Sequence, residues 1–161
     1  MKSFTKLKDV KTVLVDDDAM IRNALSMVFK NKDCYLRVCK NVEQGLQALK
    51  EERFDIIICD FRLSDMNGLE FFKLVGNRPS HILKILMATY SDEKLSSELS
   101  RVGVHAFIPK PFSVKQLTHI LVHLVEVNQK NQRICVQAAS LAGQKYYILE
   151  KENKCCHAKK H

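Results

Sequence analysis

The sequence predicts an α/β fold in which a parallel sheet carries helices on both faces. Short apolar runs alternate with amphipathic stretches five times along the chain. Parallel strands need crossover connections, usually helices, so this alternation is typical of a parallel sheet. The apolar runs are nearly unbroken, as in residues 56–59, and such runs are typical of strands buried on both faces. The crossovers are expected to be right-handed.

The individual elements are placed by the period and length of their apolar pattern. Strands are expected at residues 11–16, 34–39, 54–60, 82–88 and 104–108. Helices are expected at residues 18–31, 41–51, 67–76, 91–102 and 113–127. In the last helix, for example, Val114, Leu117, Leu121 and Leu124 recur at helical spacing.

Length and composition indicate a single globular domain with an appendage. The chain has 161 residues, of which 46% are hydrophobic. It contains no apolar run long enough to span a membrane, and residues 1–12 are too polar for a secretory signal, so we expect a cytoplasmic protein without membrane contact. Three of the six cysteines lie in apolar runs, which indicates small buried side chains in a reducing compartment rather than a disulfide framework.

Polar residues follow the predicted strands at one edge of the sheet. Residues 16–18 are three aspartates after the first strand, Asp60 ends the third, residues 88–90 follow the fourth, and Lys110 follows the fifth. The carboxyl ends of parallel strands meet at one edge, where α/β folds place their sites. Crowded carboxylates either raise a pKa or recruit a cation, and hard cations such as Mg²⁺ prefer oxygen ligands. A carboxylate is also a nucleophile that forms aspartyl phosphate.

Each of these features also has a purely structural interpretation. An acidic run after a strand is often a solvated loop, and Asp18 is a candidate N-cap for the helix that follows. The dipeptide Lys110-Pro111 alone indicates only a turn. It is their combination on separate strand ends of one sheet that favours a site for metal-assisted phosphoryl chemistry.

Three segments resemble the response-regulator receiver family: VLVDDD, IIICDFRLSDMNGLEF and FIPKPF. They occur in the family's order over about residues 10–125. The resemblance implies a flavodoxin-like doubly wound fold, with five parallel strands in the order 2-1-3-4-5. It also divides the chain into an N-terminal extension (1–9), a receiver domain (10–127) and a basic C-terminal extension of unknown structure (128–161).

The resemblance assigns the metal and phosphoryl residues. Asp60 matches the phosphoacceptor. The side chains of Asp17 and Asp60 and the backbone carbonyl of Arg62 match the direct ligands of Mg²⁺, or of Mn²⁺ in its place, while Asp16 matches a residue that acts through water. Lys110 matches the lysine that pairs with the phosphoryl group.

Further positions match the family's structural and switch residues. The Lys110-Pro111 peptide bond is expected to be cis, a form essentially limited to bonds before proline. Gly68 matches a turn glycine, where we expect a positive φ. Phe107 matches the aromatic switch residue of the fifth strand, although a core phenylalanine would give the same pattern.

The sequence departs from the family at two places. Ser64 stands where the family commonly has proline, which should only loosen a turn. More seriously, Ala88 stands where the family has the Thr or Ser that binds the phosphoryl group, and Thr89 follows it. Either Thr89 substitutes through a local shift or the switch is weakened. Tyr90 and Arg62 match the positions that tune the lifetime of the phosphate.

The function implied is a phosphorelay module rather than an enzyme in its own right. A sensor histidine kinase or a phosphotransfer protein would phosphorylate Asp60, and the domain would assist its own phosphorylation and dephosphorylation. A downstream protein would bind the face formed by residues 91–127, and a homodimer is left open. A small aspartyl phosphatase is disfavoured because the chain is too short for a substrate cap.

Two further alternatives are left open, one resting on the basic tail and one on Ala88. The chain carries a net charge of +8 and its tail is basic, so a nucleic-acid-binding regulator is an alternative that no motif supports. A phosphorylation-independent scaffold is the other. We expect a frayed basic terminus after the receiver, although the apolar residues of 133–150 could pack on it or form a dimer surface. The cysteines and histidines at the end fit no standard zinc spacing: Cys155, Cys156, His157 and His161.

Overall fold

The computed structural model describes residues 4–76, 81–89, 93–129, 137–141 and 144–148, and it describes only the backbone of 93–97, 137–141 and 144–148. The elements in chain order are η1 (Phe4–Leu7), β1 (Lys11–Val15), α1 (Ala19–Asn31), β2 (Tyr35–Cys39), α2 (Val42–Glu51), β3 (Ile56–Asp60), α3 (Gly68–Val75), β4 (Leu83–Ala88), α4 (Glu93–Val102), β5 (Ala106–Pro109), α5 (Val114–Gln129), β6 (Gln137–Leu141) and β7 (Gln144–Ile148). Ten of them are the predicted strands and helices, with shifted ends.

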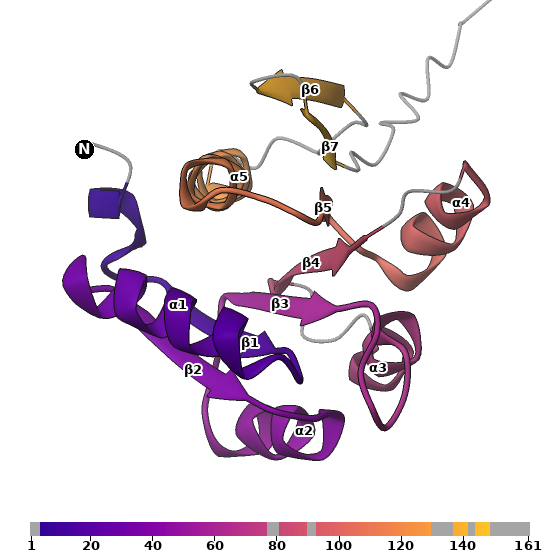
Figure 1. The fold of residues 1–161 in the computed structure, drawn as a ribbon, viewed down its shortest axis with the longest axis horizontal. Helices are drawn as coiled ribbons and strands as arrows, with labels where there is room; N and C mark the ends of the chain where they lie inside the picture. Colours follow the sequence, from indigo (N-terminus) through magenta and orange to yellow (C-terminus); the bar gives the residue numbers. More distant parts are fainter. Residues whose placement is uncertain (1–3, 77–80, 90–92, 130–136, 142–143, 149–161) are drawn as a thin grey trace, which may run out of the picture.

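The sheet has the predicted parallel core and an extension that we did not expect (Figure 1). Its order is β2-β1-β3-β4-β5-β7-β6, and the first five strands are parallel. The predicted order 2-1-3-4-5 is therefore confirmed. The expectation of a frayed terminus is wrong for residues 137–141 and 144–148, which form an antiparallel hairpin whose strand β7 pairs with β5.

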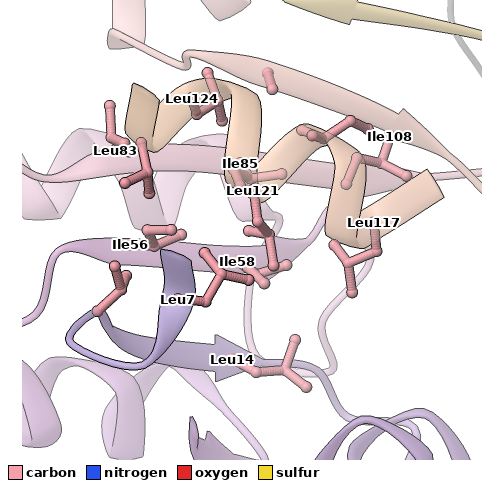
Figure 2. Close-up of a cluster of buried hydrophobic side chains, with 14 of the residues drawn as sticks. Leu7, Leu14, Ile56, Ile58, Leu83, Ile85, Ile108, Leu117, Leu121 and Leu124 are labelled. Carbon is pink, nitrogen blue, oxygen red and sulfur yellow. The ribbon is translucent and has the colours of Figure 1, made fainter. Parts of the chain in front are cut away.

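Helices cover both faces of the parallel sheet, and each face has its own core. Under α1 and α5, aliphatic side chains of the strands meet those of the helices, for example Ile58 and Ile85 against Leu121 (Figure 2). The opposite core contains Val13, Ile57 and Leu86 of the sheet with side chains of α2, α3 and α4. Burying an aliphatic or aromatic side chain of this size contributes about 1.5–3 kcal/mol, so these two layers supply most of the folding free energy.

Strand β5 begins later than predicted because the preceding residues complete the cap of α4. Gly103 has a φ of 73°, and its N–H donates to the carbonyl of Ser100. The N–H of Val104 donates to the carbonyl of Leu99, which completes a Schellman motif. Val104 therefore belongs to the helix end and not to the strand.

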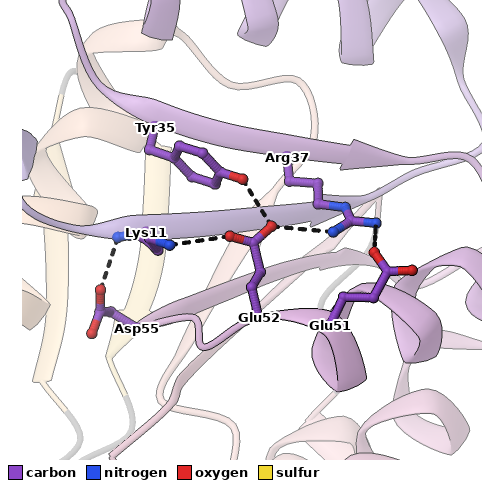
Figure 3. A network of polar contacts seen from close by, with 6 residues as sticks. All are labelled: Lys11, Tyr35, Arg37, Glu51, Glu52 and Asp55. Carbon is purple, nitrogen blue, oxygen red and sulfur yellow. Dashed lines mark hydrogen bonds and ion pairs between the residues drawn. The ribbon is translucent and has the colours of Figure 1, made fainter.

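The amino end of the sheet is held by a polar network that lies opposite the carboxyl ends of the strands (Figure 3). The hydroxyl of Tyr35 donates to Glu52 at 2.8 Å, and Arg37 pairs with both Glu51 and Glu52. Lys11 pairs with Glu52 through its ammonium group, and its backbone N–H donates to the carboxylate of Asp55. These contacts connect the end of α2 to β1 and β2, and they connect β1 to the residue that precedes β3.

Two general expectations from composition can be compared with the structure. Cys34, Cys39 and Cys59 are free and buried, as predicted, whereas the other cysteines lie outside the described residues. Within the part of the chain that the structure describes, none of the helices combines the length and apolar character needed to cross a membrane.

The packing of α3 can be tested by two truncations on the same helix. The side chain of Phe71 is fully buried, whereas that of Leu74 is 59% exposed. We expect Phe71→Ala to lower the free energy of unfolding by about 3–5 kcal/mol, because it leaves a cavity in the core. Leu74→Ala should change it by less than about 0.5 kcal/mol. Urea unfolding of both variants measures the difference, and equal effects would contradict the packing.

Candidate functional site

Strand register brings the predicted polar residues to one edge of the sheet. Val15, which precedes Asp16, pairs with Cys59, which precedes Asp60. Asp60 is in turn aligned with Met87 of β4. The ends of β1, β3 and β4 therefore lie at the same height along the sheet. The backbone N–H of Lys110 donates to the carbonyl of Ala88 at 2.7 Å, which places Lys110 beside them.

The centre of the site is the ammonium group of Lys110, which contacts two carboxylates. Its Nζ lies 2.9 Å from Oδ1 of Asp60 and 3.2 Å from Oδ2 of Asp16. Burial alone would lower the pKa of Lys110, but the hydrogen bond to Asp60 and the charge of Asp16 outweigh burial and raise it. Lys110 is therefore positively charged in the site.

Asp16 is held rigidly and buried completely. Its Oδ1 accepts from the N–H of Asp18 at 2.8 Å, and its backbone N–H donates to the carbonyl of Cys39 at 3.1 Å. Burial raises the pKa of this carboxyl, although the hydrogen bond from Asp18 and the charge of Lys110 act in the opposite direction. The ionised form of Asp16 is thus costly in the folded protein.

Three carboxylates at this edge have the chemistry of a divalent metal site. Oxygen atoms of Asp16, Asp17 and Asp60 all lie within 4.8 Å of one another. Asp18 is not part of this group, because its side chain accepts from the N–H of Met20 and caps α1. Asp17 is exposed, so solvent reaches the cluster from its side. Oxygen ligands with open solvent access fit Mg²⁺, which keeps several waters.

The loop after Asp60 is fixed tightly to the strand, and Gly68 permits this. A Cβ atom at Gly68 would lie 2.5 Å from the backbone oxygen of Asp60. The N–H of Gly68 donates to the carbonyl of Phe61, and Arg62 forms a bridge with Asn67. Our expectation of a positive φ at Gly68 is wrong: the described glycines with a positive φ are Gly76 and Gly103, and Gly68 is required for close approach instead.

The remaining predicted residues lie at the same edge but differ in exposure. Ala88 is 4% exposed and packs in the core beneath α2, α3 and α4, whereas Thr89 is exposed beyond the end of β4. The ring of Phe107 is buried, and the Lys110-Pro111 peptide bond is cis. Tyr90 lies outside the described residues.

Two residues that sequence reasoning missed support the site. The guanidinium of Arg22 donates to the backbone carbonyl of Asp16 at 2.7 Å, so α1 reaches back to the acidic turn. Asp65 accepts from the N–H of Val42 at 2.9 Å, which fixes the loop after Asp60 to the start of α2. An arginine one turn into the helix after an acidic run is a weak sequence signal for the role of Arg22. Nothing in the sequence indicates the role of Asp65.

Comparison with known proteins identifies the family. The model of the response regulator receiver domain matches residues 12–122. The chain belongs to this family. The order of the parallel strands is the one that the resemblance implied.

Relatives of this receiver domain include larger regulators. The DNA-binding transcriptional regulator NtrC of Proteus hauseri is 27% identical over 122 residues, which are 73% of this chain but only 26% of NtrC. The transcriptional regulatory protein FixJ of Bradyrhizobium diazoefficiens is 24% identical over 85% of this chain and 70% of FixJ. The crystal structure of a CheY-like receiver domain from Methanospirillum hungatei covers 76% of this chain and 98% of its own, with a TM-score of 0.70 and 23% identity.

The buried carboxylate of Asp16 makes receiver stability depend on pH in a defined direction. Because its pKa is raised in the folded state, its contribution to stability is complete below its unfolded pKa and is lost as the pH rises through its folded pKa. With metal removed by EDTA, we expect Asp16→Asn to be more stable than the parent protein at pH 7, with the gain shrinking towards about pH 4.

Urea unfolding over this pH range measures the effect of Asp16→Asn. Asp18→Asn is the matched control, because it removes a neighbouring exposed charge and asparagine still caps the helix. A loss of stability in Asp16→Asn at pH 7 would show that the pair with Lys110 outweighs the cost of burial.

Proposed function

We propose that this receiver domain is the phosphoacceptor module of a cytoplasmic two-component phosphorelay and that Asp60 takes the phosphoryl group. The observation that carries the proposal is the ammonium of Lys110, 2.9 Å from the Asp60 carboxylate, beside two further carboxylates within 4.8 Å. A nucleophile, a fixed positive charge and a set of oxygen ligands are the groups that phosphoryl transfer requires.

The transfer step follows from the chemistry of Asp60. A carboxylate oxygen attacks the phosphorus of a phosphohistidine on a kinase or phosphotransfer protein. The P–N bond breaks, and its electron pair stays with the imidazole, which takes up a proton. Asp60 is 7% exposed, so its reactive oxygen is reached only along the carboxyl edge of the sheet. Lys110 offers a positive charge to the oxygens of the incoming group.

Asp17, Asp60 and the backbone carbonyl of Arg62 would hold the Mg²⁺ ion, with Asp16 acting through water. When bound, the ion neutralises charge that develops on the phosphoryl oxygens. The carbonyl of Arg62 is held in place because its residue forms a bridge with Asn67. Asp16 is kept in position by the N–H of Asp18 and the guanidinium of Arg22.

Signalling would follow from the charge that phosphorylation adds. A phosphoryl group brings almost two negative charges and competes with Asp16 for the ammonium of Lys110. Lys110 directly follows β5, so a shift of Lys110 acts on the face formed by residues 91–127 and on the buried ring of Phe107. A partner that binds the two states of this face differently converts the shift into a signal.

One observation favours a second candidate function, a receiver-like scaffold that binds partners without phosphorylation. The position that carries the phosphoryl-binding hydroxyl in the family is Ala88, and the neighbouring Thr89 is exposed beyond the strand. A site without this hydroxyl retains the acidic pocket and Lys110 but has one contact fewer to the phosphoryl group.

The first test of the proposed function is phosphorylation by acetyl phosphate. We expect the parent protein with Mg²⁺ to gain one phosphoryl group in intact-mass spectrometry. Asp60→Asn, which removes the nucleophile but retains the size of the side chain, should gain none. Asp17→Asn should gain little, because the metal loses an oxygen ligand. A parent protein that binds Mg²⁺ without any gain in mass would favour the scaffold.

The role of Thr89 can be tested in the same assay. Because its side chain is exposed beyond β4, we expect Thr89→Val to retain the rate of phosphoryl incorporation. Ala88→Ser, which places a hydroxyl at the family's position, should prolong the phosphorylated state. A loss of more than about fivefold in Thr89→Val, the value of one ordinary hydrogen bond, would show that Thr89 supplies the missing hydroxyl.

A further inference from the structure

The outer edge of β5 is the feature of this receiver domain that its proposed function does not explain. In the five-stranded parallel sheet β5 is an end strand, and such a strand presents unpaired N–H and C=O groups that bind other extended chains. In this chain the edge is occupied, because β7 lies along it as an antiparallel strand and β6 follows beyond (Figure 1).

The backbone groups of β5 divide between its two neighbours. The N–H of His105 donates to the carbonyl of Lys84 at 2.8 Å, on the β4 side. Because successive backbone groups of a strand point to opposite edges, the N–H and C=O of Ala106 point outwards. Ala106 is aligned with Ile148 of β7, so this residue carries the pairing at the outer edge.

The pairing of β5 with β7 is short, which makes it suitable for replacement of β7 by another strand. Only Ala106 and Phe107 of β5 have partners in β7, with Ile148 and Tyr147 respectively. Further along the strand, Pro109 has no N–H to donate. A contact of two residue pairs at the sheet edge opens at a lower free energy than the core strands do.

The hairpin is also tethered closely to the strand that it covers. Seven residues, 130–136, connect the end of α5 to the start of β6. A segment of this length spans at most about 25 Å, so the hairpin remains near its own sheet. A short tether gives an effective concentration of about millimolar, which favours docking within one chain over docking between chains.

We propose that the β5 edge is a strand-binding surface and that this chain fills it with its own β6–β7 hairpin. The kind of partner that fits the edge presents an extended segment antiparallel to β5 and binds by main-chain pairing. Such a partner has to displace the hairpin first. One consequence rests on the proposed function. In the phosphorelay, output through residues 91–127 requires the hairpin to leave β5.

The experiment follows hydrogen exchange of the Ala106 amide in the full chain by NMR. Ile148→Pro removes the N–H opposite Ala106 and constrains the backbone. The control Ile148→Val keeps the N–H and adds no such constraint. We expect Ala106 to exchange at least about tenfold faster in Ile148→Pro and unchanged in Ile148→Val. A synthetic peptide of residues 137–148 at about millimolar concentration should restore protection in Ile148→Pro and leave the parent protein unaffected.

Each other outcome overturns the proposal. Equal exchange in the parent and Ile148→Pro would show that the hairpin does not occupy the edge. Protection that rises with the concentration of the parent would assign the edge to a second copy. Failure of the peptide to protect Ile148→Pro would show that the edge does not bind strands.

The control for folding is the amide of Ile57 in the centre of the sheet, which should stay protected in every variant. If Ile148→Pro loses this protection, the exchange rate of Ala106 in the parent protein still tests the proposal. An unoccupied edge would leave the Ala106 amide of the parent exchanging as fast as an exposed amide. None of these measurements needs phosphorylation, so their failure is distinguishable from failure of the proposed function.

Discussion

One ammonium group shared by two buried carboxylates is the constraint on which the site depends. Asp16 follows β1, Asp60 ends β3 and Lys110 follows β5, so the ion pairs form only when these strands are in register. A buried charge without a partner would cost several kcal/mol, which penalises any arrangement that separates them. In the function that we propose, a phosphoryl group at Asp60 would offer Lys110 a stronger partner than Asp16 does.

A second buried ammonium anchors the helices on one side of the sheet. Lys84 of β4 donates to the carbonyl of Val102 at the end of α4 and to that of Gly76 at the end of α3. The carbonyl of Val102 lies at the negative end of the α4 dipole, whereas Gly76 is the cap residue that follows α3. Helix α3 is also fixed at its start, where Gly68 lies against the backbone of Asp60. Helix α3 is therefore held at both ends, so the signalling shift that we propose for Lys110 would pass through β5 rather than α3.

The sequence predicted the parallel sheet and the central site because their signals are local. Unbroken apolar runs give the strands, and the runs of β1, β3 and β5 lead directly to Asp16, Asp60 and Lys110. Side-chain exposure was not predictable at Ala88 and Thr89, because it depends on where the strand ends within the sheet. The expectation that Gly68 has a positive φ was wrong for a similar cause. Gly68 is needed for its close approach to Asp60, which is a tertiary contact that no local pattern shows.

The hairpin was missed because the pairing of short strands depends on which edge is available. The five-stranded parallel sheet has two edges, and the chain treats them differently. At β2, Arg37 places a charged side chain on the edge strand and pairs with Glu51 and Glu52 of α2. Charged side chains discourage edge pairing. The four residues of β5 include no charged side chain, so its edge remains open to a strand, and the hairpin tethered nearby is the strand at the highest local concentration.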